Sequence, residues 1–133
     1  MIVLDEQLLG HGLEHEIAKW YPGAVCFITD LRPGSVIKDD AIPRLLLQEK
    51  QPTFITINER DFWRKIPLNS RYCVICFALS DSRAREIPSR LRILLQHPSF
   101  DSNARRMGVM IRVAEQNISY YTSRRKKVET IKL

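Results

Sequence analysis

Two carboxylates, Glu59 and Asp61, stand one residue apart just after an apolar run at residues 53–57. A β-rich run of this kind usually closes on turn residues, but this one closes on acids. An isolated buried carboxylate is costly, so acids at the tip of a buried strand must be solvated, paired or bound to a cation. A third acid, Asp5, follows another short apolar run at residues 1–4. Two strand tips that carry acids indicate one shared metal site at the carboxyl edge of a sheet.

A fourth acid, Asp39, stands at the start of a predicted helix. The candidate catalytic and metal-binding set is therefore Asp5, Asp39, Glu59 and Asp61. Its oxygen-only chemistry suits Mg²⁺ or Mn²⁺. Two such ions about 4 Å apart can activate a water and stabilise the leaving oxygen of a phosphodiester. Helix capping explains any single acid equally well, but four acids at one sheet edge favour a site.

Apolar periodicity predicts the elements that must position these acids. The predicted strands cover residues 2–5, 24–28, 53–57, 71–79, 108–114 and 118–122, and the predicted helices cover residues 7–20, 39–50, 62–66 and 88–97, with a loop at 29–38. This alternation predicts an α/β fold with an open, mostly parallel sheet. Sites in such sheets lie beyond the carboxyl ends of the strands. If Asp40 is the N-cap of its helix, Asp39 is free to face that edge.

Length and composition set the class of protein. The chain has 133 residues, of which 44% are hydrophobic and 27% charged. This predicts one globular domain over residues 1–122 and a basic C-terminal tail over 123–133. No apolar stretch approaches the roughly 20 residues of a membrane span, so no membrane partner is expected. An odd cysteine count without a basic leader before Ile2 predicts a reducing, cytoplasmic location.

The charge is divided unevenly along the chain. Residues 1–61 carry ten acids and six Lys or Arg, whereas residues 62–133 carry five acids and fifteen Lys or Arg. An acidic half that holds cations and a basic half that holds a polyanion would suit a protein that cuts phosphodiesters. Arg60, Arg64 and Lys65, which flank and follow the acids, are candidates for substrate phosphate, and the other basic residues for guiding RNA. A solvated basic surface is the competing explanation.

Two further motifs have simpler explanations. His11 to His15 matches the H-x-x-E-H pattern of a zinc protease, but the pattern lacks a third ligand and contains Gly12, so two surface histidines are favoured. Cys73 and Cys76 spell C-x-x-C within a predicted strand, where the two side chains point to opposite faces. Both are predicted to be core cysteines rather than a redox pair.

Three segments resemble short, stand-alone PIN-like proteins, which are grouped with the toxins of bacterial toxin–antitoxin pairs. These segments are Val3–Glu6, Asp39–Ile42 and Phe54–Phe62, and the resemblance covers about residues 1–80. It implies a PIN-like three-layer sandwich, with a mostly parallel central sheet between helices on both faces. It also implies metal-dependent RNA cleavage by an acid cluster, an antitoxin protein as a partner, and a homodimer.

Carried over by position, Asp5 matches the family's acid after the first strand. Asp39 matches the family's acid three residues before the helix's apolar Ile42. Glu59 and Asp61 match the two acids of the usual Thr-x-Asp-x-Asp-Phe pattern. The chain departs from that pattern twice: Glu59 replaces the more usual Asp, and Thr56 stands one position early.

Three hypotheses follow. The first is an Mg²⁺- or Mn²⁺-dependent endoribonuclease, the toxin of a toxin–antitoxin pair. The second is a catalytically inactive PIN-like module that binds nucleic acid or a partner protein, which the two departures motivate. The third is another Mg²⁺-dependent phosphoryl hydrolase, against which the lack of a Gly-rich phosphate loop counts.

Overall fold

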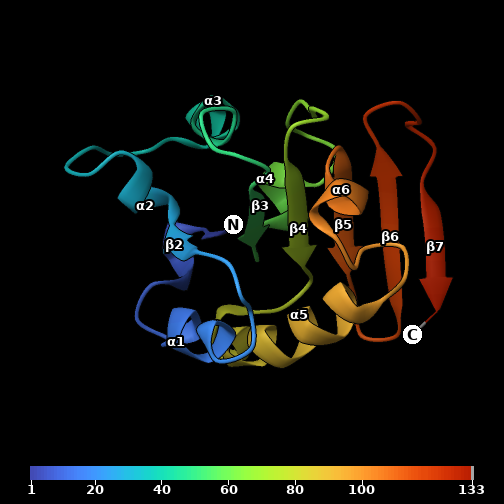
Figure 1. Ribbon diagram of the computed structural model, residues 1–133, viewed down its shortest axis with the longest axis horizontal. Helices are drawn as coiled ribbons and strands as arrows, with labels where there is room; N and C mark the ends of the chain where they lie inside the picture. The colour runs from blue at the N-terminus through green and yellow to red at the C-terminus, as the bar shows by residue number, and fades with distance from the viewer. Residues whose placement is uncertain (133) are drawn as a thin grey trace.

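Seven strands form one sheet in the order β2-β1-β3-β4-β5-β6-β7 in the computed structural model, which describes residues 1–132 (Figure 1). The strands are β1 (Ile2–Leu4), β2 (Val25–Phe27), β3 (Thr53–Thr56), β4 (Cys73–Phe77), β5 (Val109–Val113), β6 (Asn117–Thr122) and β7 (Glu129–Lys132). The first five are parallel to one another, and β6 and β7 are antiparallel to their neighbours. The predicted α/β class with a mostly parallel sheet is confirmed, with an antiparallel part at one edge.

Short helices connect these strands. They are α1 (Leu13–Ala18), α2 (Ile28–Leu31), α3 (Ile42–Leu46), α4 (Glu59–Phe62), α5 (Ile87–Gln96) and α6 (Asn103–Arg106), with 3₁₀ turns η1 (Glu6–Leu8), η2 (Asp39–Ala41) and η3 (Asp81–Glu86). No helix among residues 1–132 has both the length and the apolar character needed to cross a membrane.

Three predicted elements differ from the structure near the candidate acids. The single helix predicted at 7–20 is wrong, because Gly10 and Gly12 adopt φ angles of 87° and 69° and separate η1 from α1. Asp40 caps no helix: it lies inside the turn η2, and α3 begins only at Ile42. The helical turn predicted at 62–66 is wrong: the helix is α4, at Glu59–Phe62, and it begins there because the Asn58 side chain accepts a hydrogen bond from the Asp61 N–H.

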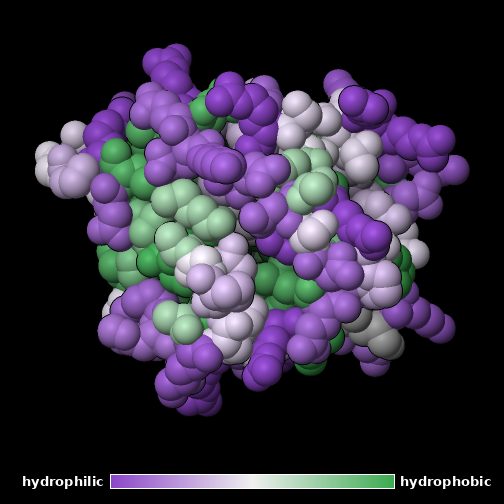
Figure 2. All heavy atoms as spheres, viewed as in Figure 1, coloured by the Kyte–Doolittle hydropathy of each residue, from purple (hydrophilic) through white to green (hydrophobic). Residues whose placement is uncertain are grey.

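Helices pack against both faces of the sheet through alternating strand residues. Leu4, Ile55 and Ile75 face a core that includes residues of α1 and α5. Val3, Phe54 and Val74 face a second core that includes residues of α3 and α4. Figure 1 shows α1 and α5 together on one side of the sheet and α3 on the other. Figure 2 shows mostly polar and charged residues on the face viewed, with apolar residues visible between them.

The pattern C-x-x-C is structural, as predicted. Cys73 and Cys76 are both fully buried, and they belong to the two opposite cores. Both are free, and burial raises the pKa of each thiol. A thiol of this kind is a poor nucleophile, because the thiolate is the reactive form.

The predicted basic tail at 123–133 contains a strand. Residues 129–132 form β7, which pairs antiparallel with β6 and supplies one edge of the sheet. The run Arg124–Lys127 occupies the connection between the two strands and is exposed. The basic residues therefore lie in a loop between two sheet strands.

Candidate active site

Asp5 lies where β1 ends and is almost fully buried, with 4% of its surface exposed. Its backbone N–H donates to the Ile55 carbonyl at 2.9 Å, and its Oδ2 accepts a hydrogen bond from Thr56 Oγ1 at 2.7 Å. Thr56 Oγ1 in turn accepts from the Asn58 N–H at 2.9 Å. The strand ends of β1 and β3 are thereby tied together. Burial raises the pKa of Asp5 to about 6, although the Thr56 hydrogen bond acts in the opposite direction.

Asp39 and Asp61 come from different elements, η2 and α4, yet both are exposed at the same edge of the sheet and the charge of Asp61 acts on Asp39. Partial burial, followed by the nearby charge of Asp61, raises the pKa of Asp39. Asn58 holds Asp61 in place, because its Nδ2 donates to Asp61 Oδ2 at 2.7 Å while its Oδ1 accepts from the Asp61 N–H at 3.3 Å. Two like charges held this close make a cation or a shared proton favourable.

The Asp39 charge also raises the pKa of Asp5, and so does the charge of Glu6. Three of the four predicted acids therefore interact at the carboxyl edge of the sheet, as the topology predicts. Glu6 is an additional acid of this cluster that sequence reasoning did not select. Its position directly after Asp5 was the available signal.

Glu59 lies at the same edge but has a different partner. Its Oε2 accepts a hydrogen bond from Arg112 Nε. Arg112 belongs to β5, where it is the register partner of Cys76 in β4. About a third of each side chain is exposed, 32% for Arg112 and 38% for Glu59. Sequence reasoning missed Arg112. The available signal was a single basic residue within the apolar strand Val109–Val113.

The three predicted phosphate-binding residues are all exposed. Arg60 is part of α4, between the two acids of that helix. Arg64 adopts a left-handed φ of 59°. Lys65 lines a cavity of about 520 Å³ together with Asp40 and residues of α3. Arg60 is thus the one placed within the acidic segment, and a role in phosphate binding stays a prediction for all three.

The histidines of the H-x-x-E-H pattern have separate partners. His11 precedes α1, and its Nε2 lies 3.4 Å from Asp81 Oδ1. His15 lies on α1, and its Nε2 is 3.6 Å from Glu14 Oε1. Because the two imidazoles contact different carboxylates, the geometry gives no support to a zinc site there.

The acids at the sheet edge fit a hard cation by their donor chemistry. Residues 1–132 contain no preformed group of three His, Cys, Asp or Glu side chains around one point. Asp5, Asp39 and Asp61 nevertheless carry carboxyl oxygens, the donor type that Mg²⁺ and Mn²⁺ prefer, and the charge of Asp39 acts on Asp5 as that of Asp61 acts on Asp39. Glu59 fits less well, because Arg112 already neutralises it.

Searches of protein-family models, curated proteins and solved structures find no match to this chain. The resemblance to PIN-like proteins therefore depends on the motif residues alone.

Proposed function

We propose that the chain is a PIN-like, Mg²⁺- or Mn²⁺-dependent endoribonuclease. The observation that carries this proposal is the charge interaction of Asp39 with Asp61 and with the buried Asp5, at the carboxyl edge of a parallel sheet. Nearby like charges raise the pKa of both Asp39 and Asp5, and acids perturbed in this way are concentrated at functional sites. Helices against both faces of the sheet agree with the proposed three-layer PIN-like sandwich.

Each residue has a definite role in this proposal. Asp39 and Asp61 would bind the cation directly, and Asp5 would complete its coordination. Thr56 orients Asp5, and Asn58 orients Asp61. A bound divalent cation would supply activation of water and stabilisation of the phosphodiester leaving oxygen. Arg60, exposed between the two acids of α4, would contact a substrate phosphate.

The test is cleavage of RNA by the purified protein with Mg²⁺ or Mn²⁺. We expect Asp5→Asn and Asp61→Asn to abolish cleavage and EDTA to stop it. Asp40→Asn is the matched control, because Asp40 is an exposed neighbour of Asp39 that no predicted role requires. Equal cleavage by the Asp5 and Asp61 variants, or indifference to EDTA, would reject the assignment.

One observation favours a second candidate, a catalytically inactive PIN-like module that binds nucleic acid. The carboxylate of Glu59 is paired with Arg112 and not with the other acids. In this case RNA binding would be sensitive to salt and would persist after Asp5, Asp39, Glu59 and Asp61 are all neutralised. Cleavage would be absent at every metal concentration. The same gel-shift and cleavage assays on one protein preparation distinguish the two candidates.

The biological setting belongs to the same proposal. As the toxin of a toxin–antitoxin pair, the chain would act in the cytoplasm on RNA, as a homodimer, and an antitoxin protein would inhibit it. Growth arrest on expression of the chain, relieved by Asp61→Asn, is the expected result. Arrest that persists in the Asp61 variant would separate toxicity from nuclease activity.

A further inference from the structure

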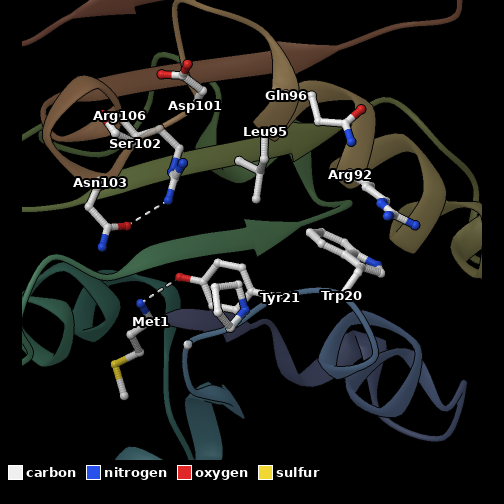
Figure 3. Close-up of a pocket in the computed structure, with 12 residues that line it drawn as sticks. Met1, Trp20, Tyr21, Arg92, Leu95, Gln96, Asp101, Ser102, Asn103 and Arg106 are labelled. Carbon is white, nitrogen blue, oxygen red and sulfur yellow. Dashed lines mark hydrogen bonds between the residues drawn. The ribbon is translucent and has the colours of Figure 1, made fainter.

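A cavity of about 540 Å³ opens at the edge of the sheet opposite the acids (Figure 3). The residues that line it precede the parallel strands: Tyr21 stands before β2 and Arg106 before β5. Trp20 and residues of α5 complete the wall. Nothing in the proposed nuclease site uses this cavity. Its volume lies within the range of small-molecule sites, which is about 300–1,000 Å³.

Arg106 is the unusual residue of this cavity. Only 4% of its surface is exposed, and the ion pairs found among residues 1–132 do not include it. Its nitrogens donate to neutral acceptors: Nη1 to the Phe100 carbonyl at 2.7 Å, Nη2 to Asn103 Oδ1 at 2.7 Å and Nε to Thr53 Oγ1 at 3.4 Å. A buried charge normally has a charged partner.

The guanidinium keeps unused donors as well as an unbalanced charge. Arginine has five N–H groups, and these three hydrogen bonds leave one further N–H on each terminal nitrogen of Arg106. Two donors on a planar fork match the two oxygens of a phosphate or carboxylate. The acid that lines the cavity, Asp101, is paired with a different arginine: its Oδ1 lies 3.7 Å from Arg105 Nε. An anion from outside the chain would supply the missing charge.

The other end of the cavity is suited to a flat ring. Figure 3 shows the Arg106 guanidinium at one end and Trp20 with Arg92 at the other. The Arg92 guanidinium lies 6.0 Å from the centre of the Trp20 ring, and Tyr21 packs edge-on to that ring at 6.2 Å. Gly23 keeps Tyr21 in position, because a Cβ there would lie 2.7 Å from Tyr21 Cε2. Aromatic and guanidinium planes are the usual surfaces on which bases stack.

We propose that this cavity binds a nucleoside monophosphate, with the phosphate on Arg106 and the base against Trp20 and Arg92. An isolated phosphate would leave the aromatic end empty, and a nucleoside would leave the guanidinium without a counter-ion. Binding therefore requires both parts of the ligand. This site is independent of the proposed nuclease activity and remains if that activity is absent.

The test is titration of the protein with AMP, GMP, CMP and UMP. The chain has two tryptophans, so Trp63→Phe leaves Trp20 as its single tryptophan, whose fluorescence can be excited apart from that of the tyrosines. We expect quenching of Trp20 with a Kd of about 0.1–1 mM for at least one nucleotide, and at least tenfold weaker binding of its nucleoside and of inorganic phosphate. In ¹H–¹⁵N spectra the Arg106 Nε–H signal should shift in the same titration.

Variants locate the two ends of the ligand. Arg106→Lys should weaken binding about tenfold or more, because lysine lacks the planar fork. Arg92→Gln should weaken it severalfold, and Arg124→Gln, an exposed arginine far along the chain and outside the cavity, should not. If Arg106→Lys does not fold, the proposal is still tested by the affinity of Arg92→Gln and by the shift of the Arg106 Nε–H signal in the wild-type protein. Equal binding of nucleoside and nucleotide, no quenching at about ten times the expected Kd, or an unchanged Arg106 signal would overturn the proposal.

Discussion

Replacement of Asp5 by asparagine should make the protein more stable at neutral pH. The carboxyl is 4% exposed, and burial raises its pKa from 3.8 to about 6. A shift of this size corresponds to about 3 kcal/mol of destabilisation by the ionised form. Asparagine has no charge to bury, and its Oδ1 can still accept from Thr56 Oγ1. Because one acceptor oxygen is lost, we expect Asp5→Asn to raise the free energy of unfolding by about 1–3 kcal/mol at pH 7.

The pH dependence follows from the direction of the shift. The folded state holds its Asp5 proton up to a pH of about 6, whereas the unfolded state loses it near 3.8. Between these values the folded state binds more protons, so wild-type stability falls as the pH rises. Above about pH 6, Asp5 is ionised in both the folded and the unfolded state, so the destabilisation that its buried carboxylate causes no longer changes with pH. Below about pH 4, Asp5 is protonated in the folded and in the unfolded state. Wild type and Asp5→Asn should then be equally stable, because any effect of the other acids is the same in both proteins.

The measurement is urea unfolding of the wild type and of Asp5→Asn at several pH values between 4 and 8. Asp40→Asn is the control, and we expect it to change stability by less than about 0.5 kcal/mol at every pH, because Asp40 is exposed. An Asp5→Asn variant that is less stable than wild type at pH 7, or a difference that does not shrink toward pH 4, would refute the account of Asp5 as a carboxylate destabilised by burial.

Three other predictions concern the same edge of the sheet. Thr56→Val should lower the free energy of unfolding by about 1–3 kcal/mol, because it removes the hydroxyl that donates to Asp5, and urea unfolding should show the larger loss above pH 6. A double-mutant cycle on Glu59 and Arg112 should give a coupling of only about 0.5–1 kcal/mol, since both side chains are about a third exposed, and about 1 M salt should reduce it. Phe62→Ala should cost about 3–5 kcal/mol in thermal or urea unfolding, because this side chain of α4 is fully buried. A Phe62 variant as stable as wild type would contradict the packing of α4 against the sheet.

Much of the sheet could be predicted from residue patterns. Continuous apolar runs mark the central strands, and β4 is fully buried along its length. The helices were harder to predict, because they are short and begin and end through local contacts. Gly10 and Gly12 interrupt the helix predicted at 7–20, and the Asn58 cap starts α4 earlier than its apolar spacing indicates. Apolar spacing records which side faces the core, not where a helix ends.

The candidate site was predicted only in part for a similar reason. Asp5 and Asp61 follow apolar strands, so topology alone brings them to one edge. The partner of Glu59 could not be predicted, because Arg112 is 53 residues away in the chain and reaches it only when β5 pairs beside β4. The cavity around Arg106 was also not foreseen, since its lining comes from segments that are separate in sequence.

Residue patterns alone predict the α/β class, the opposite orientation of Cys73 and Cys76, and the presence of acids at two strand tips. These properties follow from side-chain alternation and from the direction of parallel strands, both of which are local in the chain. Which of these acids interact depends on how distant segments pack. The charge of Asp61 acts on Asp39, while Glu59 pairs with a basic residue of β5. Charge interactions depend on separations of a few ångströms and on burial, and both are set when distant segments pack together.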